Sequence, residues 1–104
     1  MVYHAAVMYP NEADIHFDRD YYIKKHMPLV ESIWKKHGLT SWQVIEYTKS
    51  LDGSPAKYLI AATLEWESEE SLQNALQDSE TAKVFADIAN FTNVQPITMA
   101  GVGL

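Results

Sequence analysis

The stretch from Phe17 to Val30, FDRDYYIKKHMPLV, constrains the fold of this chain more than any other. Asp18 is a good helix N-cap, because its carboxylate can accept hydrogen bonds from the free backbone N–H groups of a first turn. Phe17 before this cap and Tyr22 at the fourth helical position suit a hydrophobic staple. The stretch therefore predicts a helix that begins after Asp18 and packs against the rest of the chain.

One face of this predicted helix is apolar but carries a histidine. The residues of this face follow an i, i+4, i+7, i+11 spacing, and they are Tyr22, His26, Leu29 and Ile33. Because proline lacks an N–H and clashes with the preceding turn, we expect Pro28 to split the helix. The first part would end at about Met27, and the second would run from Pro28 to His37 before Gly38. The break would then lie beside His26.

The other segments show the order β-α-β-β-α-β. Strands are expected at 2–9, 39–49, 57–66 and near 94–99. A second helical region is expected at 69–90, and its apolar pattern restarts around 78–79, which indicates two helices. In the second helical region, Leu72, Ala75 and Leu76 form the expected buried stripe. The third strand is more apolar than the second and should be central, whereas Pro96 within the last strand implies an edge, a bulge or an early end of that strand. This order predicts an α+β, ferredoxin-like fold, a four-stranded antiparallel sheet with helices on one face.

Composition limits the classes of function. With 104 residues, we expect a single domain spanning 1–104. The formal net charge of −6 argues against nucleic acid and anionic membrane surfaces as partners. The absence of cysteine excludes disulfides and thiolate catalysis, and no segment approaches the ~20 apolar residues of a membrane span. Since the N-terminal sequence MVYHAAVMYP does not resemble a signal peptide, we expect a soluble cytoplasmic protein.

The predicted sheet has apolar side chains on both faces, but the helices cover only one face. A second copy of the chain, packed about a two-fold axis, would cover the other face. We therefore expect a homodimer.

His26 is the best candidate for chemistry, because histidine can act as a general acid or base near neutral pH. Its expected companions are Tyr22, one turn earlier, and a sheet tyrosine such as Tyr3 or Tyr47, while Trp66 could form a wall of a ligand site. The structural alternative is an imidazole that holds the broken helix through a hydrogen bond to backbone. The four histidines do not show metal-ligand spacing, and no cofactor-binding motif is present, so we expect neither a metal nor a bound cofactor.

The pattern F-D-x-D-Y-Y-x-x-x-H-x-P-L-V resembles the signature of the EthD family, a branch of the dimeric α/β-barrel superfamily. This resemblance implies the same fold, the same dimer and a pocket between the helices and the sheet. It also implies a link with oxidative breakdown of ethers, with a cytochrome P450 system as partner. Related barrels include cofactor-free monooxygenases, polyketide cyclases, decarboxylases and muconolactone isomerases. Heme-degrading relatives use a histidine from the second helical region and an asparagine on the first strand, and 69–90 and 2–9 lack these residues.

Three hypotheses remain open from the sequence. The first is an enzyme that acts on an apolar oxygenated organic compound by oxidation, cyclisation, decarboxylation or isomerisation, with His26 moving the proton. The second is a non-catalytic accessory or carrier protein that binds a small hydrophobic metabolite beside an oxidase system. The third is a purely structural dimer, which would have no pocket beside His26.

Overall fold

The computed structural model describes residues 2–104. Its elements, in chain order, are β1 (Tyr3–Pro10), α1 (Arg19–Tyr21), the π-helical η1 (Tyr22–His26), α2 (Met27–Trp34), the 3₁₀ turn η2 (Lys35–His37), β2 (Leu39–Glu46), β3 (Tyr58–Trp66), α3 (Glu69–Gln77), α4 (Thr81–Ala86), the 3₁₀ turn η3 (Asp87–Asn90) and β4 (Ile97–Val102). The strands form one antiparallel sheet in the order β2-β3-β1-β4. This confirms the predicted ferredoxin-like α+β fold, with β3 inside the sheet and β4 at its edge.

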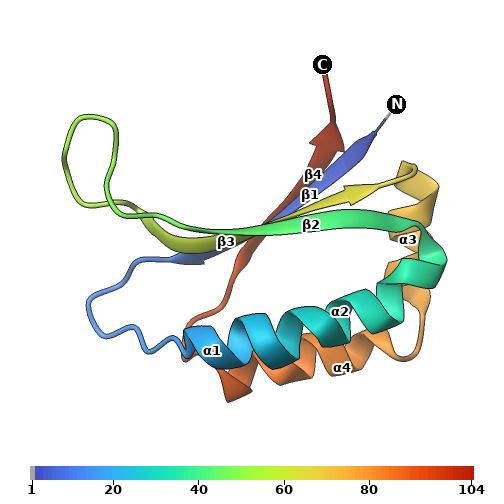
Figure 1. The fold of residues 1–104 in the computed structure, drawn as a ribbon, viewed down its shortest axis with the longest axis horizontal. Coiled ribbons are helices and arrows are strands. Elements are labelled where there is room, and N and C mark those ends of the chain that lie inside the picture. Colours follow the sequence, from blue (N-terminus) through green and yellow to red (C-terminus); the bar gives the residue numbers. More distant parts are fainter. Residues whose placement is uncertain (1) are drawn as a thin grey trace.

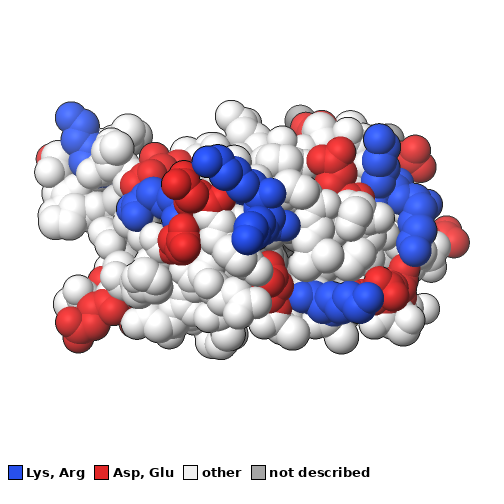
Figure 2. Space-filling view, turned by 60° about the horizontal axis from the view of Figure 1, so that its bottom comes forward, with Lys and Arg blue, Asp and Glu red and all other residues white. Residues whose placement is uncertain are grey.

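The helices lie on one side of the sheet. Figure 1 shows α1, α2 and α4 along one face and α3 at one end of it, with α2 and α4 in contact. The opposite face has no helix over it in the part of the chain that the structure describes. On the helical side, acidic and basic side chains alternate between areas of other residues (Figure 2), so this face presents no continuous basic patch. No helix within residues 2–104 is both long and apolar enough to span a membrane.

The first helical segment begins as its sequence predicts. The Asp18 carboxylate accepts a hydrogen bond from the Tyr21 backbone N–H at 3.1 Å, and the rings of Phe17 and Tyr22 meet edge to face with centroids 5.1 Å apart. The segment ends at Gly38, whose φ of +106° favours glycine. The N-cap, the staple and the end of the helix are therefore confirmed.

The prediction that Pro28 splits the helix is wrong. The chain stays helical from α1 through η2, and the residues before the proline form a π turn in which the Met27 N–H donates to the Tyr22 carbonyl five residues back. The wider π turn makes room for the proline ring, which would otherwise collide with the carbonyl of the preceding turn. His26 lies in this π turn, a feature that often marks functional sites.

Two further expectations need correction. Leu76 is 49% exposed instead of buried, although Ala75 is fully buried and Leu72 packs on the core. The last strand covers Ile97–Val102, about three residues later than expected, because the segment around Pro96 crosses from the helices to the sheet before pairing with β1. Both differences depend on the tertiary arrangement, since Leu76 and Pro96 each border one of two cavities between the helices and the sheet.

Candidate active site

His26 and Asp87 form an ion pair between the two helical regions. Nδ1 of His26 lies 2.9 Å from Oδ2 of Asp87, and their side chains are only 5% and 11% exposed. η1 supplies the histidine and η3 the aspartate, so the pair forms only when the two helical regions pack together. A carboxylate only accepts hydrogen bonds; it therefore places the proton of a neutral imidazole on Nδ1. Nε2 is then the ring nitrogen available to a ligand.

Three donors hold the carboxylate of Asp87. The hydroxyl of Tyr21 donates to Oδ1, the side-chain amide of Asn90 donates to the same oxygen at 2.9 Å, and His26 contacts Oδ2. Because each carboxylate oxygen has a fixed partner, Asp87 cannot rotate without breaking one of these contacts. The two adjacent tyrosines of the helix therefore have different contacts: Tyr21 contacts Asp87, and Tyr22 contacts His26.

Two aromatic rings enclose the imidazole of His26. The ring of Tyr22 stacks on it with centroids 5.4 Å apart and planes 12° from parallel, and the ring of Phe91 packs at 4.6 Å. Both aromatic residues are buried. Their contacts fix the imidazole plane, while Asp87 fixes its rotation within that plane.

The surroundings keep the histidine neutral and the aspartate ionised. Burial lowers the pKa of His26, and the hydrogen bond and charge of Asp87 only partly oppose this effect. Burial alone would raise the pKa of Asp87, but the hydrogen bonds from Tyr21, Asn90 and His26 outweigh it, so the pKa lies below its usual value. Burial also raises the pKa of Tyr22. At neutral pH the site therefore combines a neutral imidazole with a protonated phenol.

A small cavity of about 30 Å³ lies beside His26. Its lining includes Tyr9, Tyr22, His26 and Trp34, which carry polar atoms, and the other lining residues are apolar. This volume is room for one or two water molecules. His26 is thus among the residues that line a cavity between the helices and the sheet.

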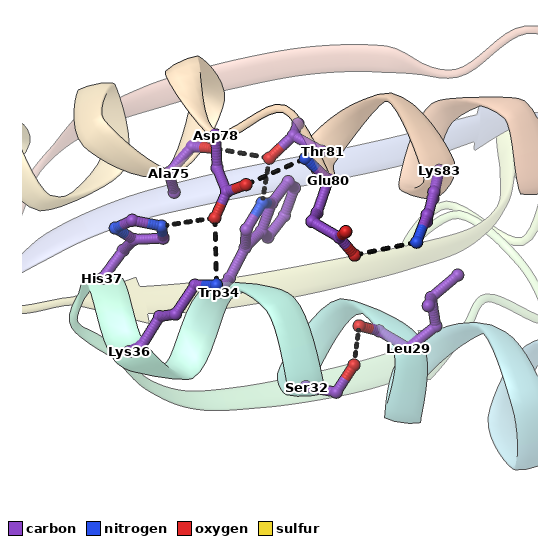
Figure 3. Close-up of polar contacts among 10 residues, drawn as sticks. All are labelled: Leu29, Ser32, Trp34, Lys36, His37, Ala75, Asp78, Glu80, Thr81 and Lys83. Carbon is purple, nitrogen blue, oxygen red and sulfur yellow. Dashed lines mark hydrogen bonds and ion pairs between the residues drawn. The ribbon is translucent and has the colours of Figure 1, made fainter.

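A larger cavity of about 330 Å³ adjoins the first one. The two share four lining residues, namely Val7, Trp34, Leu64 and Phe85. Trp34 is held in this shared wall because its Nε1 donates to Oγ1 of Thr81 at 2.9 Å, and Thr81 in turn donates to the carbonyl of Ala75 (Figure 3). Leu76 and Phe85, each 49% exposed, also line the larger cavity and lie at its opening.

A second histidine–aspartate pair lies away from both cavities. Nε2 of His37 is 2.8 Å from Oδ2 of Asp78, which also contacts Nζ of Lys36 at 3.2 Å (Figure 3). The hydrogen bond from His37 is the largest cause that lowers the pKa of Asp78. This pair joins η2 to the turn between α3 and α4 and borders neither cavity.

The structure brings only some of the sequence-predicted residues together. Tyr22 and His26 border the small cavity, and Trp66 borders the larger one. Tyr3 packs on the core six residues, or about 20 Å, along β1 from Tyr9 and borders neither cavity. Tyr47 is exposed just beyond β2, in a surface depression with Met8 and Leu51, so it does not approach His26.

Sequence reasoning missed Asp87 and Tyr9. Asp87 is an acidic residue between apolar neighbours in the segment FADIAN, a local signal that could have marked a partly buried carboxylate. Tyr9 belongs to the inward face of the first strand, and a fully buried tyrosine needs a partner for its hydroxyl. Its position at the cavity that His26 also lines, however, depends on the register of the sheet. The structure thus places Tyr9 where Tyr3 or Tyr47 was expected.

Within residues 2–104, no group of three or more His, Asp or Glu side chains is arranged to hold a metal ion. The ionisable residues that line the small cavity are a histidine and two tyrosines, and the Asp87 carboxylate next to the histidine is already occupied by three donors. The arrangement is suited to proton transfer and to hydrogen bonding of an oxygen atom.

A sequence model described as the EthD domain matches residues 12–95, a range that includes both His26 and Asp87. The chain belongs to the EthD family. A Rhodococcus erythropolis protein, described as an uncharacterized 11.0 kDa protein in the thcB-thcC intergenic region, is 29% identical over 92 residues, which are 88% of this chain and 85% of that protein. An EthD-like protein from Ralstonia eutropha JMP134 has a similar crystal structure, with a TM-score of 0.85 and 26% identity over 96% of this chain and 89% of that chain.

The EthD fold extends to more distant proteins. A protein from Jannaschia sp. CCS1, described as a dimeric ferredoxin-like protein of unknown function, has a TM-score of 0.66 at 11% identity over 98% of each chain. A likeness at this identity shows the fold alone.

Proposed function

We propose that this EthD protein binds a small, apolar, oxygenated organic molecule in the two adjoining cavities, and that His26 takes a proton from it. The single observation that supports this most strongly is the His26–Asp87 pair at the wall of an apolar cavity. Because Asp87 contacts Nδ1 and burial lowers the pKa of the imidazole, Nε2 is a proton acceptor at neutral pH. The resulting imidazolium is stabilised by the adjacent carboxylate.

The proposed step is enolisation of a carbonyl compound. The C–H electron pair next to the carbonyl becomes part of the enolate, the proton moves to Nε2, and the negative charge develops on the carbonyl oxygen. Proton removal of this kind is a step in isomerisation and cyclisation of carbonyl compounds, two of the reactions expected from the family resemblance. Of the groups beside the cavity, only His26 is a base at neutral pH, since burial raises the pKa values of Tyr9 and Tyr22.

Exchange of acidic C–H groups with solvent deuterium tests this function without a known substrate. 1-Indanone, a small apolar ketone, would be incubated in D₂O with the protein, and loss of its α-proton signal would be followed by NMR. We expect exchange above the buffer rate, and a decrease of about 10²-fold or more in His26→Gln, the range in which a general base contributes. Asp87→Asn should also slow exchange, because it removes the carboxylate that stabilises the imidazolium.

The second histidine–aspartate pair provides matched controls. His37→Gln and Asp78→Asn break a pair of similar geometry that borders neither cavity. Both variants should exchange 1-indanone at the wild-type rate. Unchanged exchange in His26→Gln, or equal losses in His26→Gln and His37→Gln, would contradict the proposal.

A carrier or accessory protein is the second candidate function. The small volume beside His26, about 30 Å³, favours it, because most of a ligand would have to lie in the larger cavity away from the imidazole. The family resemblance would then place the protein beside an oxidase such as a cytochrome P450. This candidate predicts that 1-indanone binds but that its α-protons exchange no faster than in buffer, and that mass spectrometry recovers the ligand unchanged.

We also propose that the protein works as a homodimer through the uncovered face of its sheet. Sheet register places a set of apolar residues on this face, which includes Ala6, Met8, Ile45, Ala61, Ile97 and Met99. Met99 is 58% exposed, and the related Jannaschia protein is described as dimeric. Light scattering should therefore give twice the chain mass, and Met99→Glu should shift the protein toward monomer, because the charge would be buried in the interface. A monomeric wild type would refute this proposal.

We expect the homodimer to act in the cytoplasm, since the chain contains no cysteine for disulfides.

A further inference from the structure

Tyr9 carries a buried polar group that the fold does not use. The residue is fully buried, and its hydroxyl has no hydrogen-bond partner among residues 2–104. Tyr9 borders the small cavity together with His26. From this arrangement we infer that the Tyr9 hydroxyl donates a hydrogen bond to the carbonyl oxygen of the ligand, so that the site selects ketones over hydrocarbons of the same shape. This inference rests on the proposed ligand-binding function.

The ring of Tyr9 is held in place by its neighbours. Phe17, Tyr22 and Phe91 meet it edge to face, with centroids 5.2, 5.8 and 5.7 Å away. These contacts leave the ring little freedom to turn its hydroxyl toward another acceptor. Burial, with a smaller contribution from Tyr22, raises the pKa of Tyr9, so the group remains a donor at any physiological pH.

The sizes of the two cavities define the shape of the ligand. The small cavity can receive an oxygen atom and little more, whereas the adjoining 330 Å³ cavity can receive an apolar ring system. A carbonyl oxygen beside Tyr9 would bring its α-carbon near His26, because both residues border the same small space. Tyr9 would then also hold the oxygen on which charge develops during enolisation, the role that an oxyanion-binding donor plays.

A matched pair of ligands tests the inference by binding alone. Indane and 1-indanone have nearly the same shape and differ by the carbonyl oxygen. Dissociation constants for both would be measured by titration calorimetry on the wild type, on Tyr9→Phe, and on Tyr47→Phe as a control tyrosine outside both cavities. We expect the wild type and Tyr47→Phe to prefer 1-indanone by about tenfold or more, as one hydrogen bond to an otherwise unpartnered group allows. In Tyr9→Phe the two ligands should bind equally, with indane binding unchanged.

Several outcomes would overturn the inference. A wild type that does not distinguish the two ligands, a Tyr9→Phe variant that keeps the preference, or a failure of both ligands to bind would each refute it. The result is independent of turnover. If the wild type shows the Tyr9-dependent preference but no deuterium exchange, the inference about Tyr9 stands and proton transfer by His26 is refuted.

Discussion

Replacement of Tyr9 by phenylalanine should stabilise the ligand-free protein. In most buried tyrosines this change removes a hydrogen bond and lowers stability. Here the hydroxyl is buried without a partner among residues 2–104, so the folded state loses the hydration of this group and gains nothing in exchange. Phenylalanine keeps the edge-to-face contacts with Phe17, Tyr22 and Phe91 and removes only the oxygen.

The magnitude follows from two opposing effects. An unsatisfied buried donor costs about 1–3 kcal/mol. The void left by one oxygen, on the order of 10–15 Å³, costs about 0.3 kcal/mol at about 24 cal/mol per Å³. A net gain of about 1–2.5 kcal/mol corresponds to a Tm increase of about 4–12 °C, since unfolding entropy near the Tm is about 2.1 cal/mol/K per residue for a chain of 104 residues.

Thermal unfolding followed by circular dichroism, at fixed protein concentration and without ligand, would measure this change. Tyr47→Phe alters an exposed tyrosine and should leave the free energy of unfolding within about ±0.5 kcal/mol of the wild-type value. An unchanged or lower Tm for Tyr9→Phe would refute the reasoning. The physical reading would then be that water in the small cavity already satisfies the hydroxyl.

Three further predictions concern stability. Because folding lowers the pKa of His26, the unfolded chain binds a proton before the folded protein does as the pH falls from 7 to 5. The free energy of unfolding should therefore decrease over this range, by at most about 1.4 kcal/mol per pH unit. His26→Gln should flatten this part of the pH profile measured by urea unfolding. The depressed pKa of Asp87 acts in the same direction but only at lower pH, near and below the usual carboxylate range. Thr81→Val should cost about 1–3 kcal/mol in urea unfolding, because it leaves Trp34 Nε1 without its acceptor, whereas Thr81→Ser should remain close to wild type. Gly38→Ala should lower the Tm by the equivalent of about 1–3 kcal/mol, since φ is +106° and the added Cβ would lie 2.6 Å from Oγ of Ser71; a Tm equal to wild type would contradict this.

The fold was predictable because its signals are local. Asp18 and Phe17 specify where the first helix begins, and Gly38 specifies where it ends. The greater apolar content of the third strand identified β3 as an inner strand, and the edge position of β4 is one of the three outcomes that Pro96 implied. Each of these signals acts within a few residues and needs no knowledge of distant neighbours.

The form of the helix beside Pro28 was less predictable. The missing N–H and the steric clash of proline are local facts, but a chain can relieve them by a break or by a wider turn. Packing decides between the two, because a continuous helix keeps Tyr22, Met27 and Val30 all buried against the sheet. The same packing leaves Leu76 exposed at the opening of the larger cavity.

The candidate site shows where sequence information ends. The sequence alone identified His26 as a histidine on an apolar helix face, with Tyr22 one turn away, because helical spacing fixes both positions. Only the tertiary structure brought Asp87, 61 residues later in the chain, to Nδ1 of the imidazole, and only the sheet register placed Tyr9 rather than Tyr3 or Tyr47 at the cavity. Contacts between distant segments depend on how whole elements pack, and the periodicity of a single segment carries no information about that packing.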